Sequence, residues 1–166
     1  MPRSIRRALG ALGALATAAA LTIGFASPAQ AATFLTHAQA TAQLSAAGIS
    51  WTSSGGCSDR NNPTCTSFTN VRQTSITGIK TFKSASGCAI TITAGTETGH
   101  AGGTYSHWNG YKLDIRKSTC INNYIKNHYA YVGYISGWGY QYRAASGNLY
   151  TDEGNHWDIL YYTCGC

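Results

Sequence analysis

The sequence predicts an α+β domain in which N-terminal helices pack on a mainly antiparallel sheet. Apolar residues recur at helical spacing before Cys88 and alternate with polar residues after it. The C-terminal part is rich in tyrosine, strand-like and interrupted by glycine. Helices that precede a run of strands are typical of α+β proteins, because neighbouring strands joined by short turns pair in antiparallel fashion.

The first 31 residues have the pattern of a secretory signal peptide. A basic leader, MPRSIRR, precedes a run rich in alanine and glycine, and the segment ends in an Ala-x-Ala pattern. A membrane anchor is the alternative, but the cleavage pattern favours export. We expect cleavage after Ala31, a location in the extracellular space or cell wall, and one domain over residues 32–166.

The charge balance argues against a nucleic-acid partner. The chain has 12 basic and 6 acidic residues, and three of the arginines lie in the leader, so nine basic residues face six acidic ones afterwards. Such a surface suits anionic polymers such as cell walls, but it has no dense cluster of lysine and arginine. We expect a monomer that has no membrane association once the leader is removed.

Two helical regions are expected before Cys88. Over 36–48, Thr36 is a suitable N-cap with Gln39 three places on, and Gly48 is a natural end. Over 67–84, the apolar spacing predicts one or two helices that end at Gly87.

After Cys88 the pattern changes to strands. Residues 88–94 and 111–117 alternate as strands around a long loop rich in glycine and threonine. Residues 118–128 begin with a capping Ser118 and read as a short helix. The remaining residues, 129–164, read as glycine-broken strands.

The six cysteines predict disulfides, because an even number in an exported chain favours a disulfide framework. No Cys-x-x-Cys pair supports a metal-thiolate site instead. We expect Cys57 and Cys65 to close the loop between them. We expect the cysteines at 164 and 166 to hold the C-terminus to earlier elements, with Cys88 and Cys120 as candidate partners.

The candidate metal-binding and catalytic residues lie in two short segments. In strand 111–117, Asp114 shares a face with Lys112 and Arg116, opposite the apolar set, and Gly110 allows His107 to turn back toward it. In EGNH, residues 153–156, the central Gly-Asn pair favours a tight turn that brings Glu153 and His156 into one pocket.

These residues match the needs of a catalytic zinc site. Two imidazoles and one carboxylate (His107, Asp114 and His156) are a suitable ligand set, and three protein ligands leave a fourth position for water. One zinc ion would lower the pKa of that water to about 7. Glu153 would then take the proton of the water and pass it to the leaving amine.

The double motif SHWNGYKLDI and EGNHWDI resembles the zinc D-alanyl-D-alanine carboxypeptidase and dipeptidase family, which shares its fold with hedgehog domains. The resemblance covers about 88–162. It implies a hedgehog/DD-peptidase-like fold, zinc, and hydrolysis of peptides in bacterial peptidoglycan. It assigns the metal to His107, Asp114 and His156, and the proton transfer to Glu153.

Three departures from the family pattern affect the expected activity. Tyr105 stands where many members have serine, with Ser106 next to the first histidine; Lys112 replaces a small alanine. The loop before the motif offers Glu97 and His100 where carboxypeptidases often carry an arginine for the substrate carboxylate. We therefore expect an endopeptidase, with Glu97 contacting a substrate amine.

Several roles and functions stay open at this stage. Asp158 either orients a metal ligand through a hydrogen bond or is a solvated strand residue. Further candidates for contact with the substrate or with a metal ligand are Ser106, Trp157 and His100; of these, His100 is favoured as a simple loop residue. The rival functions are a non-catalytic zinc-containing wall-binding module, a D-Ala-D-Ala carboxypeptidase, and a glycosidase that uses paired carboxylates such as Asp152 and Asp158.

Overall fold

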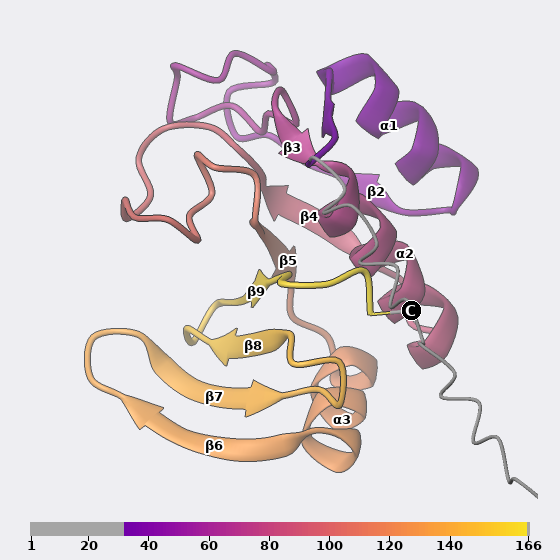
Figure 1. Cartoon of the computed structure of the whole chain (residues 1–166), viewed down its shortest axis with the longest axis vertical. Helices are drawn as coiled ribbons and strands as arrows, with labels where there is room; N and C mark the ends of the chain where they lie inside the picture. The colour runs from indigo at the N-terminus through magenta and orange to yellow at the C-terminus, as the bar shows by residue number, and fades with distance from the viewer. Residues whose placement is uncertain (1–31, 166) are drawn as a thin grey trace, which may run out of the picture. The chain divides into compact units, whose positions relative to one another are not determined.

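Helices on one side of a seven-stranded sheet form the fold of the computed structural model, which describes residues 32–165 (Figure 1). The expected signal peptide, 1–31, and Cys166 lie outside the described residues. The elements are β1 (Phe34–Leu35), α1 (His37–Ala46), β2 (Ser50–Trp51), β3 (Val71–Arg72), α2 (Gln73–Ser86), β4 (Thr91–Ala94), β5 (Lys112–Arg116), α3 (Thr119–His128), β6 (Ala130–Ile135), β7 (Gly139–Arg143), β8 (Leu149–Asp152) and β9 (His156–Leu160).

The large sheet confirms the predicted α+β class. Its strand order is β2-β4-β5-β9-β8-β7-β6, and a separate two-stranded sheet joins β1 to β3. Among the described strands, β2 and β4 pair in parallel and every other pairing is antiparallel. The described residues form one compact unit.

Helix α1 begins where the sequence predicts. Gln39 N–H donates to Thr36 Oγ1 at 3.2 Å and Thr36 N–H donates to Gln39 Oε1 at 2.9 Å, which completes a capping box. The helix buries Ala40 and Leu44 against the core.

The helix expected over 67–84 is shorter at its start than predicted. Helix α2 begins only at Gln73 and ends at Ser86, where Gly87 is the C-cap in a left-handed conformation and terminates the helix as predicted. Asn70 has a φ of 62°, which a continuous helix does not permit. The backbone of Ser67 is bound elsewhere, because its carbonyl accepts the N–H of Thr96 at 2.7 Å.

The two faces of the central strands differ in character. Leu113 and Ile115 of β5 and Trp157 and Ile159 of β9 are fully buried beneath the helices. Helix α3 covers the same face, and its N-cap is Ser118, as predicted; Ser118 Oγ accepts the N–H of Ile121 at 3.2 Å. The opposite face of the sheet is therefore left for polar residues, and the long loop between β4 and β5 arches over that side (Figure 1).

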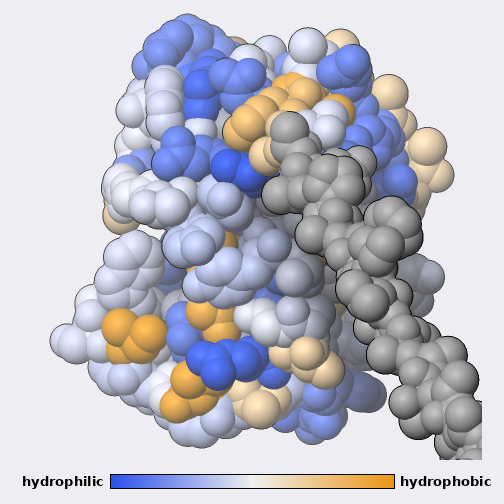
Figure 2. All heavy atoms as spheres, in the orientation of Figure 1, coloured by the Kyte–Doolittle hydropathy of each residue, from blue (hydrophilic) through white to orange (hydrophobic). Residues whose placement is uncertain are grey.

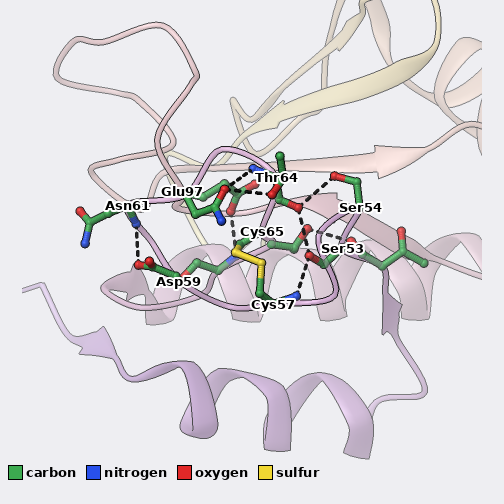
Figure 3. Close-up of a disulfide and its surroundings, with 12 residues drawn as sticks. Ser53, Ser54, Cys57, Asp59, Asn61, Thr64, Cys65 and Glu97 are labelled. Carbon is green, nitrogen blue, oxygen red and sulfur yellow. Dashed lines mark hydrogen bonds between the residues drawn. A yellow bond between two sulfur atoms is a disulfide. The ribbon is translucent and has the colours of Figure 1, made fainter.

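Two disulfides brace the described residues. Cys57 pairs with Cys65, as predicted, and closes a loop that lies beside Glu97 (Figure 3). Cys88 pairs with Cys120 and ties the segment just before β4 to the first turn of α3. The expectation that these two cysteines hold the C-terminus is therefore wrong, because each already has a partner.

The disulfides indicate an oxidising environment, because such bonds rarely persist in the cytosol. No helix in the described part of the chain has both the length and the apolar character needed to span a bilayer.

Removing the Cys88–Cys120 bond should destabilise the protein more than removing Cys57–Cys65. The two bonds close loops with sequence separations of 32 and 8 residues, and the larger loop restricts the unfolded chain more. Chain entropy predicts losses of about 4 and about 2.5 kcal/mol in the free energy of unfolding for the two double alanine variants. Urea unfolding of both variants measures the difference, and an equal or reversed order would contradict it.

Candidate metal centre

The pairing of β5 with β9 places two carboxylates side by side on the open face of the sheet. Asp114 lies directly opposite Asp158 in the antiparallel register. Both residues are buried, with exposed fractions of 5% and 4%. Burial of two neighbouring carboxylates is costly unless cations or hydrogen-bond donors compensate them.

The loop between β4 and β5 brings His107 to these carboxylates. A tight turn, in which Gly110 N–H donates to the carbonyl of His107 at 2.8 Å, reverses the chain. Gly110 has a φ of 74°, and a Cβ there would lie 2.5 Å from the carbonyl oxygen of Asn70. The predicted role of this glycine therefore has a steric as well as a conformational basis.

A backbone carbonyl orients the imidazole of His107. Its Nδ1 lies 2.7 Å from the carbonyl oxygen of Gly95, so Nδ1 must carry the hydrogen and donate it. This leaves Nε2 facing Asp114 Oδ1 at 3.2 Å and Asp158 Oδ2 at 3.6 Å. A ligating histidine whose other ring nitrogen donates to a backbone carbonyl is a recurrent arrangement in metal sites.

Three buried polar atoms at this place have no hydrogen-bond partner. They are His107 Nε2, Asp114 Oδ1 and Glu153 Oε1. A neutral imidazole nitrogen and a carboxylate oxygen are both acceptors, so they repel unless a proton or a metal ion lies between them. The donor set therefore fits a cation.

The pKa of His107 also indicates that a positive charge is stabilised between this imidazole and the carboxylates. Burial alone would lower this pKa, but Asp114 and Asp158 outweigh burial and raise it to about 10, because both carboxylates lie where they would attract and accept a proton carried by Nε2. Without a metal, the imidazole therefore holds a proton at neutral pH.

The turn between β8 and β9 adds Glu153 and His156, as the EGNH motif predicts. Glu153 N–H donates to the carbonyl of His156 at 3.2 Å, and Gly154 takes a φ of 92°. His156 Nε2 lies 3.5 Å from Asp114 Oδ2 and 3.4 Å from Glu153 Oε2. The two histidines thus approach different oxygens of the same carboxylate.

His100, a candidate for contact with the substrate or with a metal ligand, lies close enough to the cluster to be a ligand itself. Its ligand atom lies within 4.8 Å of those of His107 and Asp114, and the three can hold a metal ion. The ring of His100 stacks on that of His107 with centroids 3.9 Å apart. His100 lies in an exposed loop, as expected, but the loop folds back toward β5, which no spacing within this glycine-rich segment indicated.

Lys112 and Asp158 form a pair beside the cluster. Lys112 Nζ lies 2.7 Å from Asp158 Oδ2. Burial would raise the pKa of Asp158, but His107 and Lys112 together lower it. The solvated alternative for Asp158 is therefore wrong. Lys112 neutralises Asp158 rather than Asp114, so it leaves Asp114 free to act as a ligand.

Two other candidates, Glu97 and Ser106, have structural roles. Glu97 is buried, and its carboxylate accepts the N–H groups of Ser67 at 2.8 Å and Gly95 at 3.1 Å. These bonds and His100 lower its pKa against the opposing effect of burial, and they hold it beside the disulfide loop rather than toward a substrate amine (Figure 3). Ser106 is a turn residue, whose Oγ accepts the N–H of Asn109.

The prediction that Trp157 contacts the substrate is wrong because the residue is buried. Its side chain is fully buried on the helix-covered face, where Nε1 donates to Asn122 Oδ1 of α3 at 2.8 Å. Alternation along β9 therefore separates it from His156 and Asp158.

A cavity of about 350 Å³, here called the site cavity, opens onto the cluster. Glu153 and His156 line one part of it, and Trp138 in the turn between β6 and β7 lines another. Its further lining residues are Gly99, His100, Ala101, His107, Lys112, Asp114, Gly137 and Asp158. The cluster is therefore accessible to a small ligand or to part of a polymer.

No model of a known protein family matches the chain, and no curated protein or solved structure matches it either.

The raised pKa of His107 predicts the pH dependence of stability in the metal-free protein. The folded-state pKa of about 10 exceeds the ordinary value of 6.5, so this stabilisation is complete below pH 6.5 and is lost as the pH rises to 10. With a chelator present, the free energy of unfolding should fall from about pH 7 to about pH 9. A His107→Gln variant should show a shallower fall in urea titrations, and equal slopes would contradict the assignment.

Proposed function

We propose that the protein is an exported zinc peptidase with a hedgehog/DD-peptidase-like fold that hydrolyses peptides of the bacterial cell wall. The observation that carries the proposal is the convergence of unpartnered buried acceptors, Nε2 of His107 and Oδ1 of Asp114, beside a second imidazole. The double sequence motif supplies the zinc ligands and the reaction class.

In this proposal His107, Asp114 and His156 hold the metal. When bound, zinc acts as a Lewis acid that polarises a carbonyl group and lowers the pKa of water. Gly95 fixes the tautomer of His107 through its carbonyl. His100 lies close enough to serve as a ligand as well, but it comes from an exposed loop, whereas His156 is fixed by a strand and a turn.

Glu153 moves the proton. Burial and the neighbouring charge of Asp158 raise the pKa of Glu153, with His156 acting in the opposite direction. A raised pKa suits a carboxylate that takes a proton from the attacking water and returns it to the leaving amine. The C–N bond breaks, and the products are a carboxylic acid and an amine.

An endopeptidase remains the favoured form of this activity. A free C-terminal carboxylate would need an unpaired cation, and Lys112 in the site cavity is already paired with Asp158. Arg60, between Cys57 and Cys65, contacts the loop between β4 and β5. Its guanidinium is not an unpaired cation either, because it donates to the carbonyls of Thr96 and Trp108.

A glycosidase is less well supported. Asp152 pairs across the hairpin with Trp157, whereas Asp158 pairs with Thr151. Because adjacent residues of a strand point to opposite faces, Asp152 and Asp158 do not flank a common bond. The ion pair between Asp152 and Lys117 gives Asp152 a structural role instead.

Replacing Glu153 with glutamine should abolish hydrolysis while zinc remains bound. The amide keeps the size of the side chain but cannot accept the proton, and loss of a general base typically costs about 10²–10⁴-fold in rate. Release of peptides from purified peptidoglycan, followed by mass spectrometry, measures the activity, and metal analysis measures the zinc content.

Asp59→Asn, in the disulfide loop, is the matched control and should leave both quantities unchanged. Wild-type protein that binds zinc but releases no peptide would instead identify a wall-binding module. Release that continues in a chelator would contradict a metal-dependent peptidase.

A further inference from the structure

The loop between β4 and β5, residues 95–110, is here called the histidine loop because it carries His100 and His107. It contains no helix or strand, and glycine occupies positions 95, 99, 102, 103 and 110. Glycine gives up more conformational freedom on folding than any other residue, so such a loop is not ordered by its own sequence. A metal ion is bound tightly only where its ligands are already held near their bound positions. The contacts that order the histidine loop therefore also determine the metal affinity.

The disulfide loop, residues 57–65, contacts the histidine loop through Arg60. Its Nε donates to the carbonyl of Thr96 at 3.2 Å, and its guanidinium also donates to the carbonyl of Trp108. The carbonyl of Arg60 accepts the N–H of Thr98 at 2.8 Å. Its Cζ lies 3.6 Å from the centre of the Trp108 ring, which adds a cation–π contact. Arg60 therefore joins the two arms of the histidine loop, on either side of its histidines.

Two further contacts hold the segment just before His100. Pro63 of the disulfide loop packs against the backbone of Gly99, where an added Cβ would lie 2.9 Å from the Cβ of Pro63. The carboxylate of Glu97 accepts the N–H of Ser67 at 2.8 Å, and Figure 3 shows Glu97 beside the disulfide loop. Glu97 Oε1 in turn lies 3.5 Å from Nε2 of His100. The disulfide loop and the residues that follow it thus restrain the approach to this histidine.

The disulfide loop has little apolar packing of its own to keep Arg60 in position. None of residues 58–64 is buried, and Figure 2 shows mainly hydrophilic surface at the upper left, where this loop lies. The Cys57–Cys65 bond and hydrogen bonds within the loop fix its conformation instead. Breaking that bond would release Arg60, and with it the contacts to both arms of the histidine loop.

The second disulfide offers a matched comparison. Cys88 precedes β4, whereas the histidine loop follows β4, so the length of the strand separates this bond from the loop. Cys88 belongs to the buried core that the helices cover, on the face of the sheet opposite Asp114. The two bonds should therefore differ in how far each affects the metal centre.

We propose that Arg60 is a positioning residue for the metal centre, and that the Cys57–Cys65 bond sets the metal affinity by holding Arg60 in place. The inference rests on the metal site of the proposed function, but it does not depend on hydrolysis. It gives the two disulfides separate effects. The Cys88–Cys120 bond chiefly stabilises the fold, because it closes the larger loop, whereas the Cys57–Cys65 bond chiefly orders the histidine loop.

The test compares the wild-type chain with the two double alanine variants that each lack one disulfide. Competition with a chromophoric chelator measures the zinc affinity, and urea unfolding of the metal-free chains measures stability. We expect the Cys57→Ala, Cys65→Ala variant to bind zinc at least about tenfold more weakly than wild type. The Cys88→Ala, Cys120→Ala variant should keep the wild-type affinity although it loses more stability. Zinc affinities that follow the order of the stability losses, or that are equal in all three chains, would overturn the proposal.

Arg60→Gln tests the side chain while both disulfides stay intact. Zinc affinity should fall at least about tenfold, whereas the absorption spectrum of saturating cobalt(II) should match that of wild type, because the ligands themselves are unchanged. Arg143→Gln, at the exposed end of β7, is the matched control and should bind zinc as wild type does. Wild-type affinity in Arg60→Gln would overturn the positioning role alone. A wild-type chain that binds no zinc would instead overturn the metal site of the proposed function, and this inference with it.

Discussion

The antiparallel register of β5 on β9 is the constraint on which the candidate site depends. It places Asp114 opposite Asp158 on one face while Leu113, Ile115, Trp157 and Ile159 enter the core on the other. A shift of one residue would bury the carboxylates under the helices and expose the apolar set. The packing that stabilises the fold therefore also fixes where the negative charge lies.

Concentrated negative charge then determines what the site can hold. Two buried carboxylates need compensation, and Lys112 supplies it for Asp158 alone. Asp114 is left with two imidazoles, one toward each of its oxygens. A proton on His107 satisfies this arrangement in the absence of a metal, so metal binding and protonation compete for the same atoms.

Local sequence signals predicted the parts of the molecule whose causes are local. Capping residues set the starts of α1 and α3, Gly110 and the EGNH turn set the two reversals, and strand alternation placed Asp114. The double motif brought together His107, Asp114 and His156, but contacts between distant segments that no motif links could not be predicted. Glu97 is held by Ser67, Cys88 pairs with Cys120, and His100 folds back on His107, and no spacing within a segment encodes these contacts.

Crystals grown with zinc provide the most direct test, through anomalous diffraction measured at the zinc absorption edge. The account predicts one strong peak about 2.0–2.2 Å from His107 Nε2 and from an oxygen of Asp114, with His156 completing the set of protein ligands. No peak at this cluster, or a zinc ion bound only elsewhere on the protein, would contradict the central claim that the buried acceptors form a metal centre.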